Sequence, residues 1–341
     1  MAITFRPLEP PAEAASRGTG HGRGTVQATL IHNPAAGPRS RAADLATVRT
    51  LLRTHGWALR MEATTGPAAA TALAREAVER GDDAVIVAGG DGTINEIIQV
   101  LAGTTVALGV LPLGTVNVWA REIGLPVPFH PVAAAAALAD GACRSIDLGR
   151  AGERFFLLMA GTGFDGAVTG LVEPRLKRAM GRWAYVVTAA RLALRYGGAA
   201  ATLEMEGGTL RCRLLLAVVG NTRLYAGRFP LTASAVADDG LLDVVVFPGR
   251  RLWQVVPRLL ALLVRRVPVG PRALYYRTPR LRITADEPLP VQADGDYIGT
   301  TPMDFSVARS ALRVIVPRDA RTPLFSTPAA VPDNISGAHD G

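Results

Sequence analysis

A glycine-rich segment, Gly89-Gly90-Asp91-Gly92-Thr93, follows the apolar run 84–88 and precedes a helical pattern at 94–102. Three glycines in four positions allow positive φ angles and bring bare backbone N–H groups close to an anion. The helix N-terminus behind them adds unpaired N–H groups and a partial positive charge. These features predict a phosphate-binding loop. A capping box between Thr93 and Glu96 is an alternative explanation of the last residues, and both explanations can hold together.

Two aspartates near the C-terminus could act as proton acceptors in phosphate transfer. An alcohol that receives a phosphoryl group must lose its proton, so a carboxylate has to lie within hydrogen-bond reach. Asp294 and Asp296 are separated by one glycine, and in a strand this spacing places both side chains on one face. The dipeptide Asp294-Gly295 is equally typical of a type I′ hairpin turn. The residues alone leave both interpretations open.

The composition excludes several classes of protein. The chain has 341 residues, 49% hydrophobic and 19% charged, which indicates a folded protein of about two domains. Its net charge of +8 comes almost entirely from arginine, because Lys177 is the only lysine. P-loop NTPases and protein kinases of the usual kind need lysines at positions where this chain has none. Two cysteines and five scattered histidines give neither a disulfide framework nor zinc-ligand spacing.

The elements that must position these residues alternate in type over the first half of the chain. Apolar strand patterns are expected at 26–31, 58–63, 84–88 and 106–111. Helical patterns are expected between and after them, at 41–54, 67–80, 94–102, 117–123 and 132–139. This alternation predicts a doubly wound, mostly parallel sheet, which binds ligands at its carboxyl edge. Two further turns end strands at that edge, Asn33-Pro34 to Gly37 and Leu113-Gly114-Thr115 with Asn117.

The second half has a different pattern. Short β runs separated by turn residues begin at Phe155 and continue to Val316, a spacing that predicts an antiparallel β-sandwich. The segment Gly161-Thr162-Gly163-Phe164-Asp165 lies among them. The expected organisation is a flexible tail at 1–24, a nucleotide-binding α/β domain at 25–148, a β-sandwich domain at 149–316 and a flexible tail at 317–341. No signal peptide and no membrane-spanning segment is expected.

Two basic segments with helical apolar spacing occur in the second half, at 180–194 and 250–277, and each contains a tryptophan. For each segment alone, a helix packed on the sandwich with solvated arginines is the better explanation. Together they favour contact with an anionic membrane surface. Nucleic acid is not expected as a partner, because no recognition fold or base-stacking motif accompanies the charge.

These motifs in this order resemble those of the diacylglycerol kinase catalytic-domain family, which includes soluble bacterial lipid kinases related to sphingosine and ceramide kinases. The glycine-rich loop is shared with NAD kinases and phosphofructokinases. The ordered set is more specific: the 33–37 turn, Gly89 to Glu96, Leu111-Pro112-Leu113-Gly114-Thr115 with Asn117, Asp239-Gly240 and Asp294-Gly295-Asp296. The resemblance covers residues 26–316 and implies an NAD kinase/diacylglycerol kinase-like fold.

The resemblance also implies ligands. ATP would be bound by Asn33, Thr64, Gly89, Gly90, Asp91, Gly92, Thr93, Asn95, Glu96 and Thr115. A structural Mg²⁺ would be held by the Asp239 carboxylate and the carbonyl groups of Val236 and Leu241. Charge alone indicates that Asp91 does not touch a phosphate, so this residue is expected to act on magnesium or on a water bound to it. The proton acceptor would be Asp296, with Asp294 able to share the task.

Two departures from the family bear on activity. The family has glutamate where this chain has Asp296, which is shorter by one methylene, and many relatives have aspartate where this chain has Val118. The expected activity is ATP-dependent phosphorylation of diacylglycerol or a related lipid alcohol by a cytoplasmic, peripherally membrane-associated enzyme. The alternatives are an NAD-kinase-like enzyme with a soluble acceptor, and a catalytically weak nucleotide- or lipid-binding regulator. The oligomeric state, a homodimer included, cannot be read from the sequence.

Overall fold

The computed structural model describes residues 25–34, 36, 42–125, 130–171, 188, 191–192, 195–251, 274–318, 320 and 322–326. The predicted tail at 1–24 and most of the one at 317–341 lie outside the described residues. So do most of the two basic segments at 180–194 and 250–277.

A parallel sheet forms the first half of the molecule, as the alternating pattern predicts. Its strands are β1 (Val26–His32), β2 (Trp57–Ala63), β3 (Ala84–Gly89) and β4 (Ala107–Pro112). They lie in the order β4-β3-β1-β2, and each neighbouring pair is parallel. All residues of β3 and β4 are buried, which is the reason for their continuous apolar sequence.

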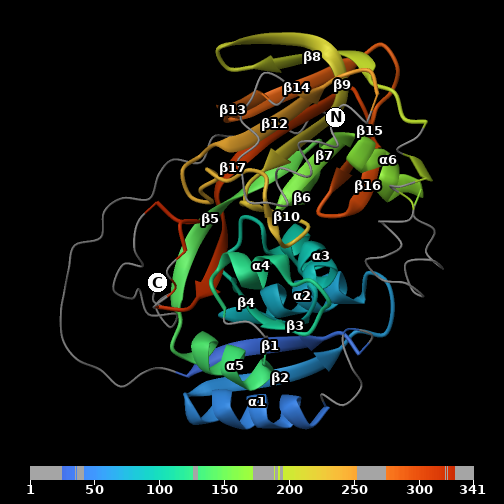
Figure 1. The fold of residues 1–341 in the computed structure, drawn as a ribbon. Helices are drawn as coiled ribbons and strands as arrows, with labels where there is room; N and C mark the ends of the chain where they lie inside the picture. Colours follow the sequence, from blue (N-terminus) through green and yellow to red (C-terminus); the bar gives the residue numbers. More distant parts are fainter. Residues whose placement is uncertain are drawn as a thin grey trace, which may run out of the picture.

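Helices cover this sheet on the connections between its strands (Figure 1). They are α1 (Ala42–Thr54), α2 (Ala69–Arg80), α3 (Asp91–Leu101), α4 (Val118–Glu122) and α5 (Pro131–Ala139). Because α3 begins directly after β3, its N-terminus lies at the carboxyl edge of the sheet.

Antiparallel strands form the second half, again as predicted. They are β6 (Arg154–Phe156), β7 (Met159–Gly163), β8 (Ala199–Met205), β9 (Gly208–Gly220), β12 (Leu242–Pro248), β13 (Leu274–Thr278), β14 (Arg280–Ala285), β15 (Pro290–Ala293) and β16 (Asp296–Thr300). The short pair β10 (Leu224–Tyr225) and β11 (Phe229–Pro230) stands apart, and α6 (Phe164–Leu171) follows β7. The sequence did not lead us to expect α6, β13 or β16.

Two long strands connect the halves. β5 (Ala142–Ala151) and β17 (Met303–Val316) pair with each other, and the end of β17 also pairs in parallel with β4. Figure 1 shows both strands running from one half into the other. The predicted boundary at residue 148 therefore falls inside β5, and the last strand of the predicted sandwich returns to the first sheet.

The buried apolar residues form two clusters. The larger one fills the first half and extends under β7 and β9, and the smaller one lies between the strands of the second half. Within the described residues, no helix is long and apolar enough to cross a bilayer.

Candidate active site

The glycine-rich loop turns directly into α3, which starts earlier than the sequence suggests. Gly90 is the N-cap residue, in an extended conformation, and the helix begins at Asp91. The predicted capping box is therefore wrong, because Thr93 lies inside the first turn and no side chain caps the helix. The predicted positive φ angles are also wrong: none of Gly89, Gly90 and Gly92 has one. The chain enters the helix through extended and helical angles that any residue can adopt.

Gly90 instead allows the backbones of two loops to approach each other closely. A Cβ on Gly90 would lie 3.2 Å from the Cα of Gly114, and one on Gly114 would lie 2.6 Å from the Cα of Gly90. The loops after β3 and β4 thus touch through their backbones. A Cβ on Gly92 would meet nothing within 4 Å, so neither packing nor φ explains this glycine. Open space over the N-terminus of an eleven-residue helix is what a phosphate group requires.

The other predicted nucleotide contacts follow the carboxyl ends of neighbouring strands. Asn33 follows β1, Thr64 follows β2 and Thr115 follows β4 by three residues. The Nδ2 of Asn33 donates to the Oγ1 of Thr93, 3.2 Å away, and the N–H of Thr64 donates to the carbonyl of His32. Sheet order therefore brings these residues to the same edge, although 60 positions separate Asn33 and Thr93.

Asp91 connects the two loops. Its Oδ2 and Oδ1 accept hydrogen bonds from the N–H groups of Val118 (3.0 Å) and Trp119 (3.2 Å) at the start of α4. Burial raises the pKa of Asp91, and these backbone hydrogen bonds oppose that rise. The carboxylate thus caps α4, a contact that the sequence analysis did not anticipate for this residue.

Asp296, from the second half, lies against α3. Its Oδ2 accepts hydrogen bonds from the Nδ2 of Asn95 at 2.9 Å and from Arg154 at 3.2 Å. Burial and the negative charge of Asp296 both raise the pKa of Glu96 on the next position of the helix. The structure therefore brings Asn95, Glu96 and Asp296 together, as a joint active site requires. The Asp296 side chain is 49% exposed, so a substrate can reach it.

Asp294 is held more rigidly. Its carboxylate accepts three hydrogen bonds of 2.7–2.9 Å from consecutive N–H groups, those of Leu157, Leu158 and Met159. Burial raises its pKa to about 6, and the charge of Asp91 adds to the rise. Its φ of 47° is left-handed, as in the hairpin turn that the sequence offered as an alternative. Asp294 is therefore a turn residue whose carboxylate is close enough to Asp91 for the two charges to interact.

The predicted magnesium ligand Asp239 has other partners. Its Oδ2 is paired with the guanidinium group of Arg277, and its Oδ1 accepts the N–H of Leu241 at 2.9 Å. The Nε of Arg277 also lies 3.4 Å from Asp243, which is fully buried. These contacts occupy both oxygens of the Asp239 carboxylate. A cation at Asp239, Val236 and Leu241 would have to displace Arg277.

Two side chains at the contact between the halves, Gln99 and Arg154, are not among the predicted site residues. The amide group of Gln99 donates to the carbonyl of Phe155 (2.9 Å) and accepts its N–H (3.1 Å). Arg154 neutralises Asp296. Gln99 follows Asn95 by one helical turn, a spacing that could have placed it on the same face. Nothing in the sequence around Arg154 marks it.

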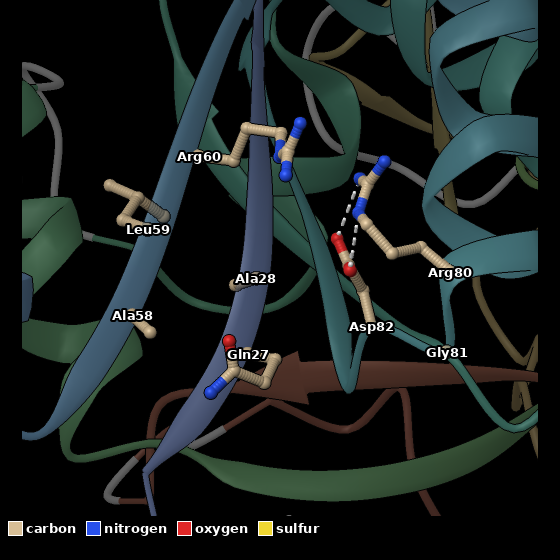
Figure 2. Close-up of a pocket in the computed structure, with 8 residues that line it drawn as sticks. All are labelled: Gln27, Ala28, Ala58, Leu59, Arg60, Arg80, Gly81 and Asp82. Carbon is tan, nitrogen blue, oxygen red and sulfur yellow. Dashed lines mark hydrogen bonds and ion pairs between the residues drawn. The ribbon is translucent and has the colours of Figure 1, made fainter.

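A pocket of about 460 Å³ lies elsewhere, against β1, β2 and the end of α2. Figure 2 shows the ion pair of Arg80 with Asp82 at its side and Arg60 reaching toward it. Its residues Gln27 and Ala58 are near the starts of β1 and β2, so the pocket is at the opposite end of the strands from the glycine-rich loop. It contains none of the predicted site residues.

Two family models match consecutive parts of the chain. Residues 27–151 match the model of the diacylglycerol kinase catalytic domain. Residues 159–316 match the YegS C-terminal NAD kinase beta sandwich-like domain.

Curated relatives match along most of their length. A "Probable lipid kinase YegS-like" protein of Pseudomonas fluorescens is 35% identical over 270 residues, 79% of this chain and 89% of the relative. A diacylglycerol kinase of Mycobacterium tuberculosis is 34% identical over 252 residues, 72% of this chain and 81% of the relative. A diacylglycerol kinase of Bacillus subtilis is 28% identical over 296 residues, 86% and 97% of the two chains.

Solved structures share the fold. A diacylglycerol kinase structure from Bacillus anthracis aligns with a TM-score of 0.69 and 21% identity, covering 86% of this chain and 98% of that one. A second structure from that organism aligns with a TM-score of 0.76 and 20% identity, covering 90% and 100%. The predicted fold class is confirmed. The chain belongs to the diacylglycerol kinase-like family of lipid kinases, and it is a kinase of the phosphotransferase class.

Proposed function

We propose that this protein transfers the γ-phosphoryl group of ATP to the hydroxyl group of diacylglycerol or a related lipid alcohol at a membrane surface. The observation that carries the proposal is the hydrogen bond between Asn95 and Asp296. It joins the helix behind the glycine-rich loop to the acidic turn of the other half, across 201 positions of sequence. This contact makes the proposed phosphate site and the proposed proton acceptor neighbours, which is the arrangement that phosphoryl transfer requires.

ATP would lie along the carboxyl edge of the parallel sheet. The N–H groups at the start of α3 and the open space over Gly92 support a phosphate there. The proposed contacts remain those predicted: Asn33, Thr64, Gly89 to Thr93, Asn95, Glu96 and Thr115. Asp91 supports this site indirectly, because it fixes the loop after β4 against the loop after β3.

Asp296 is the proposed proton acceptor. Asn95 and Arg154 hold it in place, and its partial exposure leaves room for an acceptor hydroxyl. Asp294 shapes the turn, and its carboxylate is already occupied by three backbone hydrogen bonds. The shorter side chain of Asp296, compared with the family's glutamate, already reaches Asn95. We therefore expect Asp296 to function without help from Asp294.

Magnesium enters the proposal as the counter-ion of the ATP phosphates, where it neutralises charge and orients the γ-phosphate. No step depends on an ion at Asp239, because Arg277 already supplies a positive charge there.

The surroundings of Asp296 support a lipid acceptor. Leu171 and Tyr297 are the large hydrophobic side chains that the described residues expose, at 59% and 51%. Tyr297 follows Asp296 directly, and a Cβ on Gly170 would lie 3.2 Å from its ring. The exposed apolar side chains are therefore on α6 and on the strand that carries the proposed proton acceptor, which supports a lipid substrate.

The test is incubation of the full chain with ATP labelled at the γ-phosphate, magnesium, and vesicles containing diacylglycerol, sphingosine or ceramide, with NAD as the soluble acceptor. Label is expected in a lipid and absent from NAD. Transfer to NAD alone would replace the proposal with an NAD-kinase-like activity. ATP binding without any transfer would indicate a regulator.

A further inference from the structure

The motif Gly161-Thr162-Gly163-Phe164-Asp165 has no role in the proposed reaction, yet it builds an unusual contact. Asp165 is in the first turn of α6 and points into the molecule. Its Oδ1 accepts the hydroxyl group of Tyr225 at 2.5 Å, and its Oδ2 accepts the Nε2 of Gln292 at 2.6 Å. Both partners are neutral donors. The carboxylate forms no ion pair with any residue that the structure describes.

Two glycines make room for this carboxylate. A Cβ on Gly161 would lie 2.0 Å from the Oδ2 of Asp165, and one on Gly166 would lie 2.2 Å from the carbonyl oxygen of Pro290. Gly161 is directly opposite Gln292 in the pairing of β7 with β15, so the missing side chain leaves space on the face that Gln292 occupies. The glycines thus let α6 approach β15 until Asp165 meets Gln292.

Gln292 connects Asp165 to the turn that contains Asp294 and Asp296. Its Oε1 accepts the N–H of Gly295 at 2.7 Å, while its Nε2 is bound to Asp165. Burial raises the pKa of Asp165, and the hydrogen bonds from Tyr225 and Gln292 oppose that rise. Both oxygens of the Asp165 carboxyl group act as acceptors here, so the end of the Gln292 amide that faces Asp165 is the NH₂ group. The other end must then be the oxygen, which is the atom that the Gly295 N–H needs. Gly295 lies between Asp294 and Asp296.

We propose that Asp165 is a positioning residue which acts through Gln292 to fix the turn that aims Asp296 at α3. This inference rests on the proposed function, because Asp296 is the proton acceptor only there. The contact has a direct consequence for the turn itself. Without the correct amide orientation, the Gly295 N–H would face the Gln292 NH₂ group and the turn would lose a hydrogen bond.

The test first removes the donor of the Gln292–Asp165 hydrogen bond and then exchanges the donor and acceptor between the two residues. Gln292→Glu places a second carboxyl group 2.6 Å from the Asp165 oxygen. Two carboxyl groups this close share a proton at neutral pH, so the assay is run at about pH 9, where loss of that proton leaves two carboxylates that repel each other. We expect kcat to fall by about tenfold to a hundredfold, as for a misplacement of about 1 Å. The KM for ATP should stay within about twofold, because the glycine-rich loop is untouched.

Asp165→Asn combined with Gln292→Glu should restore function. The NH₂ group of the introduced asparagine can donate to the introduced glutamate, while its amide oxygen accepts the Tyr225 hydroxyl. The other glutamate oxygen then accepts the Gly295 N–H. We expect kcat of the double variant to return to within about threefold of the wild type. Asp165→Asn alone is the matched control.

Hydrogen exchange of the Gly295 amide gives a second readout that does not need kinase activity. It should accelerate in Gln292→Glu and slow again in the double variant. Gln292→Glu with wild-type kcat and exchange, or a double variant no better folded or active than Gln292→Glu, would overturn the inference. If the wild type phosphorylates no acceptor, the proposed function fails, and amide exchange alone decides whether the positioning contact exists.

Discussion

Two acidic turns in the second half look alike in sequence and differ in their surroundings. One contains Asp294 and Asp296, and the other contains Asp239 followed by Gly240. In the first turn, backbone N–H groups, the Asn95 amide and the half-buried Arg154 hold the carboxylates. In the second turn, Arg277 pairs with Asp239 and with the buried Asp243.

The difference separates the proposed chemical role of Asp296 from a structural role of Asp239. Asp296 lies at the contact with α3 and is open to solvent, so it can exchange a proton with a substrate. Asp239 is neutralised by Arg277. The N–H of the next residue, Gly240, donates a hydrogen bond to the Asp147 carboxylate at 2.7 Å. Acidic residues followed by glycine are therefore not enough to identify a site, because their partners decide what they do.

The largest expected effect separates the two turns by rate. Asp296→Asn should lower kcat for lipid phosphorylation by about a hundredfold to ten-thousandfold, because a general base is lost. ATP binding, measured by calorimetry, should persist. Arg277→Gln, which removes the partner of Asp239 in the other turn, should keep kcat near the wild-type value. Equal losses in both variants would mean that the comparison is wrong.

A pair of glycine substitutions tests the loop that faces the first turn. Gly92→Ala adds a Cβ where the protein has open space, so it should weaken ATP binding about tenfold or more. It should leave the free energy of unfolding unchanged or raise it by up to about 1 kcal/mol, since alanine favours helix. Gly114→Ala should lower both the ATP affinity and the free energy of unfolding, because its Cβ would lie 2.6 Å from the Cα of Gly90. If Gly92→Ala binds ATP as tightly as the wild type, the phosphate does not bind over Gly92.

The pH dependence of the reaction should report on Asp294. With a pKa of about 6, this carboxyl group takes up a proton as the pH falls from 7 to 5. Its three N–H partners then face a weaker acceptor, and the turn loosens. We expect kcat to fall up to about tenfold per pH unit below 6, and to depend little on pH in this range in the slower Asp294→Asn variant. A wild-type profile that is flat from pH 5 to 7 would contradict this.

The raised pKa of Asp294 also makes the stability of the folded protein depend on pH. The pKa of Asp294 is higher in the folded protein than the ordinary value of 3.8, so the folded state binds the proton more tightly. The contribution of this group to stability is therefore complete below pH 4 and is lost as the pH rises through about 6.

The smallest expected effect concerns the second turn. Arg277→Gln leaves the buried Asp243 with the hydroxyl group of Tyr275 as its remaining side-chain donor among those described. The loss should destabilise the protein by about 1–3 kcal/mol, with partial exposure of Arg277 limiting the effect. Magnesium should raise the melting temperature of this variant and leave that of the wild type unchanged in the absence of ATP. A lower melting temperature of the wild type in the presence of a chelator would instead support a metal ion at Asp239.

The sequence could predict the elements of the first half because their patterns are long and periodic. β3 and α3 were located within three residues, and Asn33, Gly90 and Thr115 were expected at one edge because parallel strands end there. It could not place the start of α3, because Thr93 and Glu96 imitate a capping box. Arg154 and Gln99 escaped notice because their partners are distant in the chain.

The sequence by itself determined the fold class and the chemistry available: a glycine loop before a helix, and carboxylates in turns. Those follow from local rules of periodicity and residue type. The tertiary structure decided which carboxylate meets the loop, which one pairs with arginine, and that Asp165 controls the orientation of Gln292. These contacts depend on strand order and on close approach at Gly114 and Gly161, which no local pattern encodes.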